Sequence, residues 1–252
     1  MMIYIFLFII GLCFGSFFNV LIYRLPLGLS ITGRSFCPKC KQKIFWYNNI
    51  PLLSFLFLRG RCRHCHSPIS WRYPLVELIT AILTLFIIHY SVFSNLDYLL
   101  TTYYLLIIYA LIVIFFIDLE HEIIPDQIIY PAIIISVLYI VLNTKYLILN
   151  YMVSGILAAG LFLLLFLITR GRGMGFGDIK LTLLMGLFLG FPKIIIALYL
   201  AFLTGALFGV ILILVGRKKL KSHIPFGPFL VGSTIIALFW GELIWSKILL
   251  VF

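Results

Sequence analysis

Long uncharged apolar runs restrict this chain to a membrane fold. Hydrophobic residues make up 63% of its 252 residues, charged residues make up 11%, and the mean hydropathy is +1.19. A water-soluble core cannot bury so many apolar side chains, whereas about 20 apolar residues form a helix that spans the bilayer. The sequence therefore predicts an all-α polytopic membrane protein with about eight transmembrane helices, in the runs 1–23, 78–95, 99–117, 127–144, 146–169, 181–192, 194–216 and 224–241.

Basic residues are distributed unevenly over the predicted loops. When eight helices are threaded with the N-terminus outside, sixteen Lys and Arg residues, including the cluster 217–221, lie inside and three lie outside. This bias predicts that both chain ends face away from the cytoplasm, and it accounts for the net charge of +11 without nucleic acid. The run 181–192 is the weakest span. If it is a re-entrant segment instead, fourteen basic residues lie inside and five lie outside. The run 1–23 is interpreted as a retained helix, because it lacks a basic n-region and a small-residue cleavage site.

The one sizeable polar stretch, residues 24–73, lies between the first two predicted spans. It holds four of the five cysteines as two C-x2-C pairs, Cys37 with Cys40 and Cys62 with Cys65. Four thiolates on two tight turns can close a tetrahedral structural Zn²⁺ site, which would supply much of the folding free energy of so small a segment. Two disulfides are the alternative, but a cytoplasmic location favours zinc.

The chain then divides into three parts. A first transmembrane helix occupies 1–23, a cytoplasmic four-cysteine insert occupies 24–73, and a transmembrane helical bundle occupies 74–252. Nine of the nineteen basic residues lie between Arg24 and Arg72, and this surface suits anionic lipid headgroups better than RNA.

Two aspartates stand at the edges of predicted spans. Asp118 closes the uncharged run 99–117, and Asp178 opens the apolar segment that continues from Ile179. Carboxylates in such places are functional-site candidates, and two of them on one membrane face can share a proton and hydrolyse a peptide, as in aspartic proteases. Two alternatives remain: Asp178 caps its helix while Asp118 pairs with Lys180, or the carboxylates bind ions in a transporter.

Several neighbours of these aspartates have simpler interpretations. Asp126 is typical of a helix start, and Glu120 and Glu122 indicate a wetted interfacial loop. Gly175 and Gly177 belong to an alternating glycine strip that could hold an extended peptide. A dinucleotide-binding fingerprint is rejected for this strip, because no βαβ unit surrounds it.

Taken together, these motifs resemble the bacterial prepilin peptidases, the type IV leader peptidases of the GxGD aspartic protease class. The resemblance covers nearly the whole chain, and it implies that Asp118 and Asp178 are the catalytic pair while Asp126 accompanies the first motif. It rests on the order and spacing of residues 15–20 and 23–26, the two C-x2-C pairs, 73–77, Asp118 with 124–126, 175–180 and 225–228.

The resemblance also implies an activity. Family members remove the short basic leader from prepilins or pseudopilins after a glycine, at the cytoplasmic face of the bacterial inner membrane. Many also methylate the new N-terminal amine with S-adenosylmethionine, an activity associated with the N-terminal half and its cysteine insert. The function predicted for this chain is therefore a bifunctional leader peptidase and N-methyltransferase whose partners are the substrate helix and the bilayer. An ion- or proton-coupled transporter with a zinc-stabilised cytoplasmic loop is the alternative.

Two further residues are expected to support this site. Glu77, at the start of the second span, either orients the substrate amine or forms an interfacial ion pair with Arg72 or Arg24. Lys180 either acts on the Asp178 carboxylate or extends to lipid headgroups.

Overall fold

The computed structural model of this chain describes residues 2–144, 147–171, 174–215 and 225–251. The basic cluster 217–221, which was predicted to face the cytoplasm, lies outside these ranges. The chain forms two compact units, Met1–Leu105 and Leu106–Phe252. Helix α4 starts in the first unit and ends in the second.

Every regular element among the described residues is a helix, as predicted, and two isolated β-bridges are the only extended pairing among them. Seven of these helices are long and apolar enough to cross a membrane. The remaining predicted span, 181–192, corresponds to α7. This helix has only 14 residues and includes most of that run, which was expected to be the weakest span. In chain order the elements are α1 (Met2–Arg24), η1 (Trp46–Asn49), α2 (Leu53–Phe57), α3 (Arg72–Phe93), α4 (Tyr98–His121), α5 (Asp126–Asn143), α6 (Ile148–Thr169), α7 (Phe176–Leu189), α8 (Lys193–Leu214) and α9 (Gly227–Val251).

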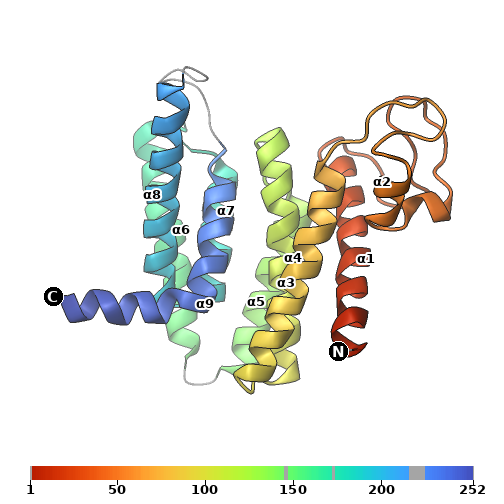
Figure 1. Cartoon of the computed structure of the whole chain (residues 1–252). Coiled ribbons are helices and arrows are strands. Elements are labelled where there is room, and N and C mark those ends of the chain that lie inside the picture. The colour runs from red at the N-terminus through yellow and green to blue at the C-terminus, as the bar shows by residue number, and fades with distance from the viewer. Residues whose placement is uncertain (1, 145–146, 172–173, 216–224, 252) are drawn as a thin grey trace. The chain divides into compact units, whose positions relative to one another are not determined.

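In the first unit, α1 lies along α3 (Figure 1). Two glycines four residues apart on α1 allow this close approach. A Cβ atom on Gly11 would lie 2.6 Å from the Cα of Ala81, and one on Gly15 would lie 2.5 Å from the Cα of Glu77. Small residues at this spacing let two membrane helices pack backbone against backbone. The pair therefore fixes the start of α3, where Glu77 lies, against α1.

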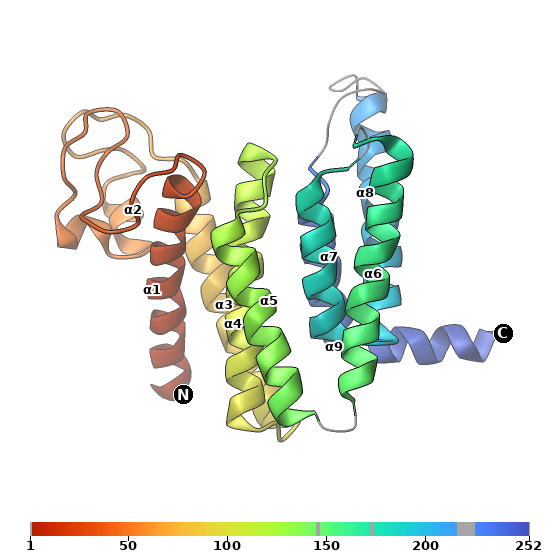
Figure 2. The same cartoon turned by 180° about the vertical axis from the view of Figure 1, so that it is seen from behind.

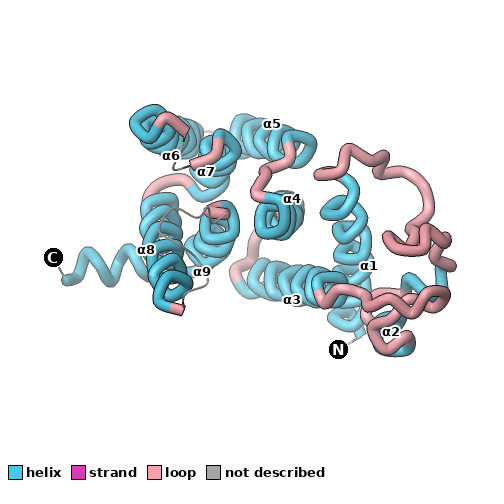
Figure 3. The backbone as a smooth tube through the Cα atoms, turned by 90° about the horizontal axis from the view of Figure 1, so that it is seen from above, coloured by secondary structure: helices cyan, strands magenta, loops and turns pink. Residues whose placement is uncertain are grey.

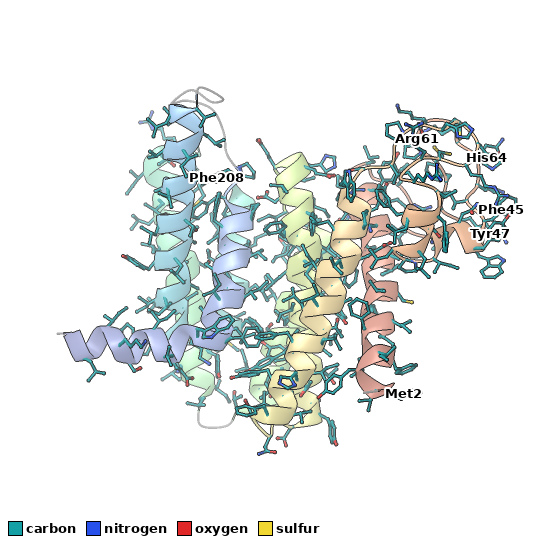
Figure 4. The ribbon with its side chains drawn as sticks, in the orientation of Figure 1. Met2, Phe45, Tyr47, Arg61, His64 and Phe208 are labelled. Carbon is teal, nitrogen blue, oxygen red and sulfur yellow. The ribbon has the colours of Figure 1, made fainter. Side chains whose placement is uncertain are left out.

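The insert between α1 and α3 has little regular structure. It contains η1 and the short helix α2, and its aromatic rings meet near its surface rather than in a core. Phe45 and Tyr47, labelled in Figure 4, stack with ring centroids 5.5 Å apart, and the guanidinium of Arg63 lies 5.6 Å from the Tyr47 ring. Packing of this kind buries little apolar area, so the insert needs another source of stability.

In the second unit, α7 lies among α5, α6, α8 and α9 and contacts all four (Figure 3). Ten of its fourteen residues are buried. Helices α6 and α7 lie side by side and run in opposite directions (Figure 2). They touch at Gly186, where a Cβ atom would lie 2.5 Å from the Cα of Gly155. Protein rather than lipid therefore surrounds α7, which removes the usual length requirement for a lipid-exposed helix.

Candidate active site and metal centre

Asp118 lies in the last turn of α4 and is only 5% exposed. Its Oδ2 atom accepts a hydrogen bond of 3.0 Å from the main-chain N–H of Gly227, the first residue of α9. Gly227 is also buried, and a Cβ atom at this position would lie 2.5 Å from the same carboxylate oxygen. Residues 109 positions apart in the chain thus meet at the carboxylate.

Asp178 is the third residue of α7 and is 7% exposed. Its Oδ2 atom accepts a hydrogen bond of 3.1 Å from the main-chain N–H of Gly175, which is the N-cap residue of the helix. The side chain therefore caps its own helix, as one alternative from the sequence held. Capping engages one oxygen, and the Asp118 carboxylate lies close enough to interact electrostatically with Asp178.

Lys180 pairs with Asp126 and not with the Asp118 carboxylate that the capping alternative assigned to it. The Lys180 Nζ atom lies 2.5 Å from Oδ1 of Asp126, and it also lies over the rings of Tyr130, at 4.9 Å, and Phe176, at 5.3 Å. The ion pair connects the first residue of α5 to the fifth residue of α7. Asp126 is thus at the helix start, as predicted, and it fixes the beginning of one helix to the beginning of another.

The two glycines at the start of α7, Gly175 and Gly177, serve different purposes. Gly177 is needed for space, because a Cβ atom there would lie 2.9 Å from the Cβ of Ile124 in the loop between α4 and α5. Gly175 is exposed, has an extended backbone and supplies the capping N–H. Close packing of Gly177 on Ile124 brings the start of α7 to the loop that follows Asp118.

Glu120 and Glu122 are both exposed, as expected, but only Glu122 lies in the loop, because α4 continues through Glu120 to His121. Glu120 lies 4.0 Å from His121, and Glu122 is near enough to Asp118 to interact with it electrostatically. Neither is enclosed in the way that Asp118 and Asp178 are.

The four cysteines of the insert come together. Their Sγ atoms all lie within 4.8 Å of one another, and all four cysteines are free thiols. Free thiols agree with the zinc interpretation, whereas the alternative would have joined them in two disulfides. The exposed His64, labelled in Figure 4, is outside this group.

Each C-x2-C pair forms the same turn. An isolated bridge joins Phe36 to Lys43 around the first pair, and another joins Arg61 to Pro68 around the second. The first cysteine of each pair accepts a hydrogen bond from a main-chain N–H four residues later, Lys41 for Cys37 (2.9 Å) and His66 for Cys62 (3.0 Å), both of which have positive φ. Two matching turns therefore present their thiols to one point.

The chemistry of these thiols suits a metal ion. A hydrogen bond with the Ser67 hydroxyl lowers the pKa of Cys65 to about 6, which favours the thiolate that binds metals. Sulfur atoms about 3.8 Å apart follow from tetrahedral Zn–S bonds of about 2.3 Å, and the Cys37 and Cys65 Sγ atoms are 3.9 Å apart. The four residues Cys37, Cys40, Cys62 and Cys65 can thus hold one metal ion.

Glu77 lies at the junction of α3 and the insert and is 8% exposed. Its Oε2 atom accepts a hydrogen bond of 2.8 Å from the main-chain N–H of Leu52, a residue with a φ of 58° that precedes α2. Arg24, one of the two partners expected for Glu77, instead donates to the main-chain oxygens of Ser30, Thr32 and Arg34. Glu77 therefore anchors the insert to α3.

Gly227 and Leu52 are the site neighbours that sequence reasoning missed. Gly227 stands between Pro225 and Pro228, in the segment 225–228 that contributed to the prediction only through the family resemblance. A glycine at a helix start, flanked by prolines, was a usable signal of close backbone approach.

Comparison with known proteins places this arrangement in a family. The family model described as "Bacterial Peptidase A24 N-terminal domain" matches residues 9–91, and the one described as "Type IV leader peptidase family" matches residues 105–210. The search of solved structures gave no match.

Three similar relatives each carry the name prepilin leader peptidase/N-methyltransferase. The protein from Legionella pneumophila is 35% identical, over 92% of this chain and 89% of its own length. The protein from Aeromonas salmonicida (strain A449) is 37% identical, over 93% and 90%, and that from Pseudomonas aeruginosa is 33% identical, over 93% and 89%. With both halves of the chain matched, the protein belongs to the type IV leader peptidase family.

Proposed function

We propose that this chain removes the leader from type IV prepilins or pseudopilins and methylates the new N-terminal amine, and that Asp118 and Asp178 are the catalytic pair of the peptidase. The single observation that carries the assignment is that Asp118, in the last turn of α4, and Asp178, in the first turn of α7, are both buried and lie within electrostatic reach of each other. Family membership leaves the transporter alternative without support.

The proposed hydrolysis uses one proton shared by the pair. Two carboxyl groups close together cannot both ionise cheaply, so one is protonated and the other is ionised. The ionised carboxylate takes a proton from water as the water oxygen attacks the scissile carbonyl carbon, and the protonated partner gives its proton to the carbonyl oxygen. The C–N bond of the resulting diol then breaks, the leaving amine takes up the proton that came from water, and one diol hydroxyl returns a proton to the other carboxylate. The new carboxylic acid is thereby formed, and the pair again holds one proton.

The main-chain hydrogen-bond donors at the two carboxyl groups support a mechanism in which one oxygen of each group is held and the other reacts. Gly227 N–H holds Oδ2 of Asp118, and Gly175 N–H holds Oδ2 of Asp178, at 3.0 and 3.1 Å. Two oxygens are thereby fixed, and in the proposed reaction the other oxygen of each carboxylate exchanges protons with water and the peptide.

We assign supporting roles to five further residues. Asp126 and Lys180 hold the starts of α5 and α7 together, Gly177 allows α7 to pack on the loop after Asp118, and Gly175 caps α7. Glu77 joins the insert to the membrane helices and is the candidate for orienting the amine that is methylated.

The proposed metal is a structural Zn²⁺ ion held by Cys37, Cys40, Cys62 and Cys65. Four protein thiolates leave no open coordination position, so the ion would stabilise the insert and not act in the reaction. The methyl group would come from S-adenosylmethionine, but no cluster among the described residues identifies where this donor binds.

The test of the peptidase assignment compares Asp118→Asn, Asp178→Asn and Glu120→Gln in purified protein with a prepilin substrate. Each Asn variant should lower the rate of leader removal by at least on the order of 10³-fold, while the exposed Glu120→Gln control keeps the wild-type rate. Each variant should elute from size exclusion and unfold like the wild type. Full cleavage by either Asn variant would rule out the assignment.

Methyl transfer is tested by mass spectrometry of the processed substrate. Incubation with S-adenosylmethionine should add the mass of one methyl group to the new N-terminus, and omission of the donor should abolish the addition. An N-terminus that stays unmodified under both conditions would show that this chain is a peptidase alone.

We propose that the aspartates and the insert face the cytoplasm, as the distribution of basic residues indicates. Helix α7 supports the eight-span threading, because it reverses the chain direction between α6 and α8 (Figure 2). A phosphatase fused after residue 252 should then be active in the periplasm, and a fluorescent protein fused there should be dark. The opposite result would mean that one span is missing from the threading.

A further inference from the structure

Gly227 donates a main-chain hydrogen bond to Asp118, and its lack of a side chain lets the carboxylate lie close to its backbone. Its N–H lies 3.0 Å from Oδ2 of Asp118, and a Cβ atom would lie 2.5 Å from this oxygen and 3.0 Å from the carboxylate carbon. Real Cβ atoms do not approach so closely, so any side chain here would displace the carboxylate. The backbone at Gly227 is not in the left-handed region, so space and not conformational freedom requires glycine.

We propose that Gly227 is a positioning residue for catalysis, which fixes the rotation of the Asp118 carboxylate so that its other oxygen faces the reaction. The inference rests on the proposed function, because it assumes that Asp118 is catalytic. It adds a third segment, the start of α9, to a site that the aspartate motifs alone assign to α4 and α7.

The position of the donor strengthens this role. The first N–H groups of a helix have no partner within the helix, and the helix dipole there favours negative charge. The start of α9 therefore serves Asp118 as the start of α7 serves Asp178. Among the described residues, the charged groups that act electrostatically on Asp118 are Asp178 on α7 and Glu122 in the following loop, and both are acidic. Gly227 N–H is thus the donor that offsets negative charge at Asp118.

Glycine 232 provides a matched control within the same helix. A Cβ atom on Gly232 would have nothing within 4 Å, in contrast to Gly227. Gly227→Ala should lower kcat about 100-fold or more with a small change in KM, because the carboxylate must rotate while the substrate-binding surface is kept. Gly232→Ala should match the wild type in both constants. A Gly227→Ala enzyme with wild-type kcat would overturn the inference.

A backbone substitution separates positioning from folding. Glycolic acid at position 227, introduced by misacylated suppressor tRNA in cell-free synthesis, replaces the N–H with an ester oxygen and adds no side chain. We expect kcat/KM to fall about 10- to 100-fold, as for a lost hydrogen bond to a charged group. The acidic limb of its pH profile should move to higher pH, because the donor favours the ionised carboxylate.

The outcomes distinguish this inference from the proposed function. A wild-type rate and pH profile in the ester variant would refute the role of Gly227, provided that Asp118→Asn is inactive. Cleavage by Asp118→Asn itself would instead refute the catalytic assignment, whatever the behaviour of Gly227.

Discussion

The four-cysteine insert and helix α7 are both short segments, yet they are held in opposite ways. Between residues 25 and 71, all of which are described, Cys37 is the one buried residue. In α7, ten of fourteen residues are buried among four other helices. A segment with so few buried residues gains little from apolar contacts and would depend on a metal ion held by its thiols, whereas a segment surrounded by helices is held by packing. The two regions should therefore respond to different perturbations.

Metal removal should have the largest effect, and it should be confined to the insert. Structural zinc in small domains supplies on the order of 10 kcal/mol, which this segment cannot replace by packing. Treatment with a chelator, or Cys37→Ser with Cys40→Ser, should make residues 25–71 sensitive to proteolysis while the helices of the second unit stay intact. Cys13→Ser on α1 is the control and should keep the metal content of the wild type. An insert that resists protease without metal would contradict the comparison.

Removal of an aromatic side chain should give the second-largest difference between the two regions. Phe188 on α7 is 4% exposed, and Phe57 on α2 is 83% exposed. Phe188→Ala should lower the free energy of unfolding by about 3–5 kcal/mol, whereas Phe57→Ala should change it by less than about 0.5 kcal/mol. Unfolding by SDS in mixed micelles measures both. Equal losses would mean that the insert has a core of its own.

Glycine-to-alanine substitutions should test the backbone contact between α6 and α7. Their effects on the free energy of unfolding should be smaller, and opposite in sign at the contact and away from it. Alanine normally favours a helix over glycine by up to about 1 kcal/mol. At Gly186 the added Cβ meets the Gly155 backbone, so Gly186→Ala should instead destabilise by about 1–3 kcal/mol. Gly160→Ala on α6, with nothing within 4 Å, should be neutral or stabilising. A stable Gly186→Ala protein would show that the two helices can separate at little cost.

The ion pair between Asp126 and Lys180 should give the smallest effect. The Asp126 side chain is 57% exposed, so the pair should contribute about 1 kcal/mol or less. Lys180→Asp should reduce leader removal a few-fold, and Asp126→Lys in the same chain should restore most of the loss. If the double variant is no better than the single one, the pair does not hold α5 to α7.

The sequence predicted the features that depend on nearby residues. The C-x2-C spacing indicated the thiol cluster, because each pair lies on one local turn. Asp178 was expected either to cap its helix or to share a proton, and it does cap α7. By contrast, Lys180 had several carboxylates within reach on the segment 118–126, and no local rule selects Asp126 among them. The start of α7 at Phe176, ahead of its predicted apolar run, follows from packing of Gly177 on Ile124.

The sequence by itself determined that this chain is an all-helical membrane protein with four clustered thiols and two aspartates at the edges of apolar runs. These properties depend on the length and spacing of short segments, which the amino-acid order states directly. Only the tertiary structure decided that α7 lies among four helices and that Gly227 donates to Asp118. Such contacts join residues far apart in the chain: the end of α4 meets the start of α9 through the Asp118–Gly227 hydrogen bond, and α7 packs against α9.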